Sequence, residues 1–448
     1  MADPAAAGAP RAPLAVAQLD LAGPDGPVLS LAPAPGGPPP APGDHVYLLV
    51  RFRGRPAATL LVPVPEDADP PIVLGAAARD ALTALEPREP REAPRLTPPP
   101  ATVVVATRER AGQLARALDS LLGQDHPDFT VLVVDNAPLT DATRRLVEGT
   151  YGDRGVRYVR EDTPGLAAAH NRGLAAAGGT ASDTAARAAH TDPAAPDVVA
   201  FTDDDVVADP HWLTSLTAPF AEDPRVGCVT GLILPARLRT PAQVLLESHG
   251  GFAKGFAPRD YDPLRPPADD PLFPFTAGRF GSGANMAFRT SALKAVGGFD
   301  PATGTGTPAR GGDDLYGFVR VLTAGHRLRY TPDALVWHHH RETWQDLRNQ
   351  AYGYGAGLTA YLTALLVRRP ALLPALLARL PRGLAHARAI TAHRTGDQRD
   401  VPGAHGTQTH SWPRELSWLE RRGMLHGPFG YVRARRRVRG TRPPWEVR

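Results

Sequence analysis

The chain has 448 residues, of which 42% are hydrophobic and 21% are charged, a composition typical of a globular protein with a substantial core. A net charge of +4 excludes a protein that binds polyanions over its whole surface. The 49 prolines and 44 glycines are more than regular elements accommodate, so part of the chain must form loops or remain disordered.

The first hundred residues predict three segments in chain order. Residues 1–43 are rich in Ala, Pro and Gly, and we expect a disordered arm because this composition buries too little apolar surface to offset its ordering entropy. Residues 44–86 predict a small unit, in which HVYLLVRFRGRPAATLLVPV is typical of a β-hairpin and an Ala/Leu helix follows. Residues 87–100 are charged and proline-rich, which predicts a linker.

Residues 101–342 alternate short apolar runs with helical spacing. The runs TVVVAT (102–107), FTVLVVD (129–135), VRYVR (156–160) and VVAFT (198–202) predict strands. Near-continuous Val and Leu runs between helices are typical of parallel strands buried on both faces, which indicates an open, doubly wound α/β sheet. Residues 343–448 are helical in pattern and rich in Arg, which predicts a C-terminal extension.

Polar side chains follow three of these predicted strands. Thr107 and Arg108 follow the first, Asp135 follows the second, and Asp203 to Asp205 follow the fourth. Ligands bind at the carboxyl ends of strands in such sheets, so we expect a binding crevice at this edge. No glycine-rich phosphate loop follows the first strand, which argues against dinucleotide-binding and P-loop enzymes.

The three consecutive aspartates from Asp203 to Asp205 need positive charge, because adjacent carboxylates repel each other. Mg²⁺ or Mn²⁺ would supply it, since hard cations prefer oxygen ligands and often bridge carboxylates to substrate phosphates. A solvated acidic turn before the helix at Pro210 is the alternative interpretation.

Seven motifs in order extend this interpretation: VVVATRER, VLVVDNAP, GLAAAHNRGL, VVAFTDDDV, GSGANMAFRTSAL, VGGFD and GGDDLYGFVR. Together they resemble glycosyltransferase family two, whose members are inverting enzymes of GT-A fold that use nucleotide sugars. The resemblance runs from about Thr102 to Arg341. It implies a Rossmann-like open mixed sheet, and it makes residues 178–197 an inserted surface loop.

The resemblance also implies roles for particular residues. The nucleotide-sugar site would be lined by Thr107, Arg108, Asp135, Asn171, Asp203 and Asp204. The metal ligands would be Asp205, Asp203 and His338, and the catalytic base would be Asp314, with Asp313 beside it. Gly283 and Asn285 would lie near the acceptor and the transferred sugar.

Each of these groups also has a structural interpretation. Asp313 and Asp314 would complement the positive end of a helix dipole. The histidines of VWHHHRE would form a polar strand end; because His338 and His340 project to one face, His340 is the second candidate ligand. The loop around Gly283 would serve the fold alone. No H-E-x-x-H spacing occurs, which disfavours a zinc hydrolase.

The function that the resemblance implies is inverting transfer of a sugar from a nucleotide-diphosphate donor to a hydroxyl of a glycan, glycolipid or polyprenyl-linked acceptor. A metal would stabilise the diphosphate leaving group, and a carboxylate would deprotonate the attacking hydroxyl. One alternative is a nucleotidyltransferase, although ATRERAGQ lacks the usual glycine-rich loop. The other is a non-catalytic scaffold that binds sugar nucleotides.

Cellular location is indicated by cysteine usage and hydropathy. The single cysteine, Cys228, fits a reducing compartment, and no apolar run approaches the roughly 20 residues that span a bilayer. We therefore expect a cytoplasmic bacterial protein. The Leu- and Arg-rich segment from residue 358 and the basic YVRARRRVRG predict contact with the inner face of an anionic membrane. Nucleic acid is disfavoured, because aromatic side chains are not interleaved with the basic ones.

Overall fold

A computed structural model describes residues 12–85, 96–177, 198–249, 251–379, 381–382 and 412–438. Most of the predicted linker and the whole predicted insertion at 178–197 lie outside these residues. The same holds for the first 11 residues of the predicted disordered arm.

The N-terminal module comprises residues 12–85 and contains a four-stranded sheet in the order β2-β1-β3-β4 within the described part of the chain. Its elements are β1 (Ala15–Leu21), β2 (Val28–Pro33), β3 (His45–Phe52), β4 (Arg55–Pro63) and α1 (Pro70–Leu85). The predicted hairpin and helix are present. The predicted disorder of residues 1–43 is wrong for residues 12–43, because β1 pairs in parallel with β3 and buries Ala17, Leu19 and Leu21. The average composition of the segment conceals this short alternating run.

The main sheet has nine strands within the described residues and the order β11-β13-β10-β12-β8-β5-β6-β7, with β9 paired to β13. The strands are β5 (Ala101–Thr107), β6 (Phe129–Asn136), β7 (Val156–Glu161), β8 (Val198–Asp203), β9 (Val206–Ala208), β10 (Val226–Pro235), β11 (Arg259–Tyr261), β12 (Asn285–Arg289) and β13 (Arg327–His338). The four predicted strands are parallel neighbours in the order β8-β5-β6-β7. Antiparallel β12 joins β8 to β10 and makes the sheet mixed. The predicted open mixed α/β sheet is thus confirmed.

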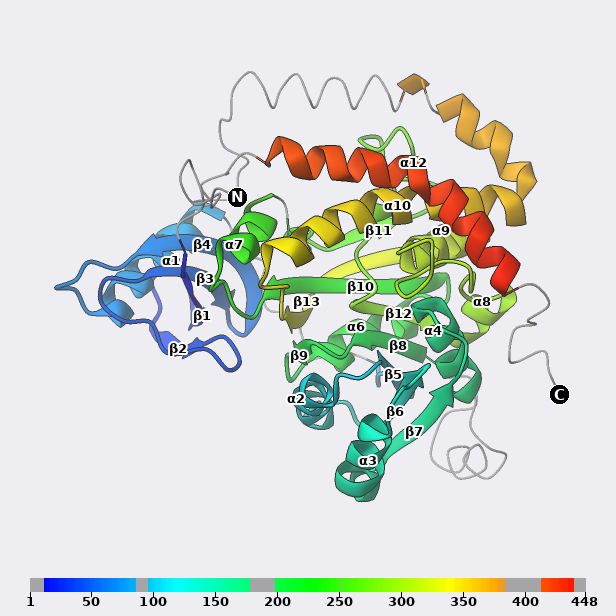
Figure 1. The fold of residues 1–448 in the computed structure, drawn as a ribbon. Helices are drawn as coiled ribbons and strands as arrows, with labels where there is room; N and C mark the ends of the chain where they lie inside the picture. The colour runs from blue at the N-terminus through cyan, green and yellow to red at the C-terminus, as the bar shows by residue number, and fades with distance from the viewer. Residues whose placement is uncertain are drawn as a thin grey trace.

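Helices cover both faces of this sheet (Figure 1). They are α2 (Ala111–Leu122), α3 (Ala142–Leu146), α4 (Leu166–Ala176), α6 (Trp212–Glu222), α7 (Pro241–Ser248), α8 (Thr290–Ala295), α9 (Asp313–Thr323), α10 (Trp344–Arg368) and α12 (Arg414–Arg437). Alternate residues of β5 show the two-sided burial, since Val104 packs in the core of α4 and α9 whereas Val103 and Val105 pack in the core of α2 and α6. This explains the near-continuous apolar strand sequences.

The two long C-terminal helices, α10 and α12, pack against each other, and α10 also packs against α9 (Figure 1). Glycines permit the close approach, because a Cβ added at Gly355 would lie 1.9 Å from the Glu420 carbonyl oxygen. Tyr431 of α12 donates a buried hydrogen bond of 2.9 Å to Asp300. No single helix among the described residues is long and apolar enough to cross a membrane; one pair, Trp344–Arg368 with Pro370–Arg379, meets the criteria jointly but is bent by 112°.

Candidate active site

The register of the parallel strands brings the predicted polar residues to one edge of the sheet. Thr107 at the end of β5 pairs with Asp135 at the end of β6, and Ala106 pairs with Asp203 at the end of β8. The Thr107 hydroxyl donates a 2.6 Å hydrogen bond to Asp204. The polar residues of three strand ends therefore lie together at one edge of the sheet.

Asp203, Asp205 and His338 form a candidate metal centre. One ligand atom from each lies within 4.8 Å of the others. His338 ends β13, and its pairing with Val206 of β9 places it beside Asp205, with Nε2 3.3 Å from the Asp205 Oδ1 atom. Two carboxylate oxygens and an imidazole nitrogen are a donor set that suits Mn²⁺ or Mg²⁺, so the residues fit the predicted ion.

The electrostatics of this cluster favour a bound cation. Burial and the charge of Asp205 raise the pKa of Asp203 to about 7. Burial also acts to raise the pKa of Asp205, but the hydrogen bond and charge of His338, together with Arg110, hold it below its usual value. Asp205 in turn raises the pKa of His338 against the opposite effect of burial. His338 and Arg110 thus offset only part of the electrostatic repulsion between the closely spaced carboxylates.

Arg110 supplies positive charge that the sequence interpretation missed. Its Nη1 atom lies 2.5 Å from Asp204 and 3.1 Å from Asp205. The motif VVVATRER contains Arg110, but the sequence prediction names Arg108, which follows the strand directly and is exposed in the structure. Arg110 precedes α2 and reaches back over the same strand ends.

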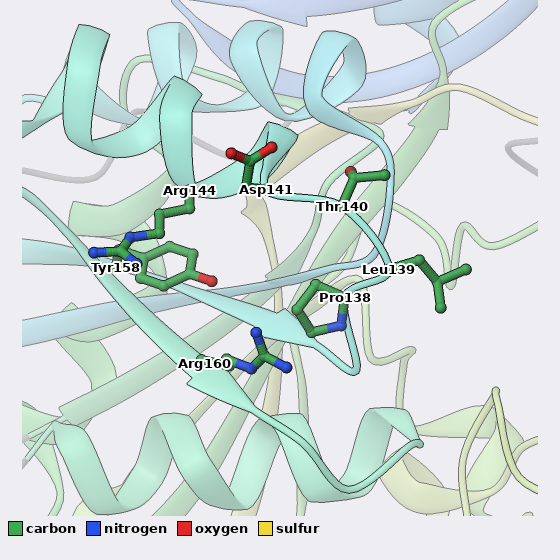
Figure 2. A pocket seen from close by; sticks show the side chains of 7 residues that line it. All are labelled: Pro138, Leu139, Thr140, Asp141, Arg144, Tyr158 and Arg160. Carbon is green, nitrogen blue, oxygen red and sulfur yellow. The ribbon is translucent and has the colours of Figure 1, made fainter.

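Asp135 is fully buried beside a pocket. The Tyr158 hydroxyl donates a 3.1 Å hydrogen bond to its Oδ2 atom, whereas Oδ1 has no hydrogen-bond partner among the described residues. Burial raises the pKa of this carboxyl. The pocket has a volume of about 490 Å³ and is lined by Pro138, Leu139, Thr140, Asp141, Arg144, Tyr158 and Arg160 (Figure 2). Tyr158 thus connects the pocket to a carboxylate with an unused acceptor atom.

Asp314 lies in the first turn of α9, next to the loop that leads into β12. Its Oδ2 atom accepts a 2.9 Å hydrogen bond from the Gly283 backbone nitrogen, and its Oδ1 atom accepts one from Leu315. Since Asn285 pairs with Thr202 of β8, this loop adjoins the end of the strand that carries Asp203. Burial and the charge of Asp313 raise the pKa of Asp314 to about 6.

The structure separates Asp313 from Asp314. Asp313 is buried, and its Oδ2 atom lies 3.2 Å from Nδ1 of the buried His170. The preceding Gly312 has φ 88°, and a Cβ there would lie 2.4 Å from the Gly357 carbonyl oxygen. This glycine turn sets the direction of the helix start, so Asp313 faces the interior and only Asp314 faces the loop at Gly283. The predicted catalytic role of Asp313 is not supported by this geometry.

Two predicted ligand-binding asparagines are engaged within the fold. The Asn171 amide exchanges hydrogen bonds of 2.8 and 2.9 Å with the Phe299 backbone. Asn285 is fully buried; it accepts from Trp212 Nε1 and donates to two backbone carbonyls, those of Leu232 and Ala334. A buried amide with these partners is not free to contact a ligand, so we assign both residues a structural role in place of the predicted contacts.

We expect Asn285→Ala to lower the free energy of unfolding by roughly 3 kcal/mol, because it leaves three buried polar groups unpaired. Urea denaturation would measure this change. The exposed Asn349→Ala is the matched control and should change stability by less than about 0.5 kcal/mol. A loss of sugar transfer at unchanged stability would instead favour an acceptor contact at Asn285.

His340, the second candidate ligand, does not join the metal cluster. Its Nδ1 atom lies 3.0 Å from His338 Nδ1, and its Nε2 atom lies 3.1 Å from the Glu247 Oε2 atom. The predicted shared face of His338 and His340 is confirmed. Both ring nitrogens of His340 are nevertheless already engaged.

Comparisons with known proteins identify the family of this chain. The family model described as "Glycosyltransferase like family 2" matches residues 98–352. Pre-mycofactocin glycosyltransferases of two Mycobacterium tuberculosis strains, CDC 1551 / Oshkosh and ATCC 25618 / H37Rv, are each 31% identical over 262 residues, which cover 57% of this chain and 46% of the relative. The chain therefore spans about half the length of the curated relatives it matches.

Among solved structures, distant likenesses are found. The mannosyltransferase PcManGT from Pyrobaculum calidifontis, in complex with GDP-Man and Mn²⁺, has a TM-score of 0.44 and 20% identity, covering 80% of this chain and 95% of its own. GalNAc-T7 with UDP, GalNAc and Mn²⁺ has a TM-score of 0.39 and 15% identity, covering 60% and 48%. The family match itself spans more than half of the sequence, and the chain belongs to the glycosyltransferase family 2-like proteins.

Proposed function

We propose that this protein is a metal-dependent inverting glycosyltransferase that moves a sugar from a nucleoside-diphosphate donor to an acceptor hydroxyl. The observation that carries the proposal is the grouping of Asp203, Asp205 and His338 at the strand ends that also bear Asp135. A cation site beside a nucleoside site is what a diphosphate donor requires, because its leaving group carries negative charge.

The donor would lie across the ends of β6, β5 and β8. Asp135 has an unused carboxylate oxygen and is hydrogen-bonded to Tyr158, which lines the pocket, and this carboxylate would accept a hydrogen bond from the base. Asp203, Asp205 and His338 would hold Mn²⁺ or Mg²⁺, which acts as a Lewis acid on the diphosphate when bound. Arg110, already beside Asp204 and Asp205, would add positive charge next to the phosphates.

Asp314 would deprotonate the attacking hydroxyl. Hydrogen bonds from the backbone of Gly283 and Leu315 fix its carboxylate, and a carboxylate fixed in this way can accept a proton without reorganising. Direct attack on the sugar carbon would form the new glycosidic bond as the bond to the diphosphate breaks. One such displacement inverts the configuration at that carbon.

A donor screen tests this function. The full chain would be incubated with Mn²⁺, several nucleotide sugars, and glycan, lipid-linked or pre-mycofactocin acceptors, the last because the curated relatives carry that name. Mass spectrometry should detect a glycosylated acceptor and nucleoside diphosphate, both of which should be lost with EDTA. Pyrophosphate formation from a sugar phosphate would indicate a nucleotidyltransferase instead, and absence of metal-dependent donor binding by calorimetry would favour the scaffold.

The exposed face of α12 supports membrane contact. Trp418, Leu425, Phe429 and Val432 are all exposed and follow each other at helical spacing along one face. Exposed arginines flank this face, namely Arg421, Arg422, Arg433, Arg435, Arg436 and Arg437. α12 lies on the outside of the molecule over α10 (Figure 1). An apolar stripe edged by arginine suits an anionic lipid surface, and this would bring the site to lipid-linked acceptors.

Vesicle sedimentation tests the membrane contact. Replacing Arg435, Arg436 and Arg437 by Gln should lower affinity for phosphatidylserine vesicles roughly 100-fold, since each basic residue contributes about 1 kcal/mol. The matched control replaces three exposed arginines elsewhere, Arg116, Arg154 and Arg265. Equal binding of both triple variants, or no binding of the unaltered chain, would contradict the proposal.

A further inference from the structure

A chain of hydrogen-bonded side chains runs from the N-terminal module to the candidate metal centre. Tyr47 of β3 donates a 3.0 Å hydrogen bond to Glu247 Oε1 in α7, and Glu247 Oε2 lies 3.1 Å from His340 Nε2. His340 Nδ1 lies 3.0 Å from Nδ1 of the candidate ligand His338. We propose that Tyr47, Glu247 and His340 are positioning residues that hold His338 for the metal, so that the N-terminal module is part of the metal site.

The environment of these side chains supports a positioning role. Tyr47 is 4% exposed and His340 is 3% exposed, and the Phe252 ring packs 5.3 Å from the His338 ring and 5.6 Å from the His340 ring. Burying polar groups in such surroundings costs about 1–3 kcal/mol for each group left unpaired. Each of these side chains is therefore held in the orientation that keeps its hydrogen bond, and the orientation of the His340 ring in turn restrains that of the His338 ring.

One set of proton positions satisfies all three hydrogen bonds, with Glu247 accepting from both His340 and Tyr47. A ligating His338 Nε2 needs its lone pair free, so its proton must sit on Nδ1 and be donated to His340 Nδ1. His340 then carries its own proton on Nε2, which it donates to Glu247. Glu247 keeps Oε1 to accept from Tyr47. Metal-bound histidines generally donate their other ring nitrogen in this way, which fixes the tautomer and the ring orientation.

The N-terminal module is docked firmly enough to serve this purpose. Tyr47 and Leu49 pack with Leu234 and Trp337 of the main sheet in one apolar cluster. Arg51 forms a buried ion pair of 2.6 Å with Asp209, which directly follows β9. Arg55 pairs with Asp333 of β13, and neither residue is a member of the hydrogen-bonded series Tyr47, Glu247, His340 and His338. The last contact therefore offers a variant that perturbs docking alone.

Mn²⁺ binding to the full chain tests this inference, which rests on the proposed metal-dependent function. Free Mn²⁺ would be titrated by electron paramagnetic resonance, with no donor or acceptor present. Glu247→Gln should weaken binding up to about 10-fold, the lower end of the range for a direct partner of a metal ligand, because Glu247 acts on His338 through His340. Tyr47→Phe should weaken Mn²⁺ binding less than Glu247→Gln does, because Glu247 still accepts a hydrogen bond from His340. Arg55→Gln should leave the Mn²⁺ affinity unchanged, and thermal unfolding would show that each variant is folded.

The outcomes separate this inference from the proposed function. If His338→Gln abolishes Mn²⁺ binding while Glu247→Gln and Tyr47→Phe bind as tightly as the unaltered chain, the positioning role is overturned and the metal site stands. If Arg55→Gln weakens binding as much as Tyr47→Phe, the effect comes from docking and the positioning role is again overturned. If the unaltered chain binds no Mn²⁺, or His338→Gln binds it equally well, the metal assignment itself fails.

Discussion

Replacing Asp205 with Asn is expected to weaken Mn²⁺ binding at least about 100-fold and to lower the rate of sugar transfer roughly 1,000-fold. The change turns one of the three protein ligands, whose ligand atoms lie within 4.8 Å of each other, into a neutral amide that binds a divalent cation more weakly. Weakening a direct ligand should reduce the metal affinity by more than the roughly 10- to 100-fold that is typical of removing a residue that hydrogen-bonds to a ligand. Stabilising a leaving-group charge is worth several kcal/mol, and about 4 kcal/mol corresponds to this change in rate.

Asp204→Asn is the matched variant for metal binding. Asp204 is also buried and precedes Asp205 in the sequence. Its carboxylate accepts hydrogen bonds from Thr107 and Arg110 and does not belong to the metal cluster. Its Mn²⁺ affinity should therefore stay within a few-fold of the unaltered value, although donor binding should weaken. Calorimetry with Mn²⁺ would compare the two variants. Equal losses in both would show that overall charge, rather than ligation, governs binding at this edge.

Replacing Asp314 with Asn should lower kcat about 1,000-fold while leaving the dissociation constants of Mn²⁺ and the nucleotide nearly unchanged. The amide keeps the shape of the side chain and one oxygen for the Gly283 nitrogen, but it loses the hydrogen bond from Leu315 and cannot take up a proton. General-base catalysis contributes roughly 10²- to 10⁴-fold, which sets the expected range. Steady-state kinetics together with calorimetry would separate the two effects. Full transfer activity in this variant would remove Asp314 from the mechanism.

The pH dependence of the unaltered protein provides an independent check on Asp314. A general base acts only when ionised, and the pKa of Asp314 is raised to about 6 by burial and by Asp313. Transfer should therefore be fully active well above pH 6 and fall about tenfold for each pH unit below it. Asp313→Asn removes the nearby charge and should shift this acid limb to lower pH. An acid limb at the same pH in both proteins would contradict the assignment.

The parallel strands and the acidic cluster could be predicted because both are local patterns. Apolar runs such as VLVVD between helices indicate two-sided burial, and carboxylates that follow a strand must lie at its end. Local sequence patterns did not predict a residue's role where that role depends on the direction of its side chain or on its tertiary contacts. Asp313 and Asp314 are adjacent and chemically identical, yet the turn at Gly312 sends one inward and the other to Gly283.

Other errors have related causes. Residues 12–43 look disordered by composition, but a short alternating run in β1 gains its stability from pairing with β3. Asn285 follows a glycine-rich loop, as a ligand contact would, yet its three partners come from Trp212 and from the neighbouring strands β10 and β13. In each case the deciding partner lies far away along the chain.

The amino-acid sequence by itself determined where this protein places the parallel strands β5, β6, β7 and β8 and where its carboxylates gather, since periodicity and composition act over a few residues. Only the tertiary structure decided which groups meet those carboxylates. His338 reaches Asp205 through the pairing of β9 with β13, and Tyr47 reaches the same site through α7. Such contacts depend on strand order, register and docking, because these bring together residues that no local pattern relates.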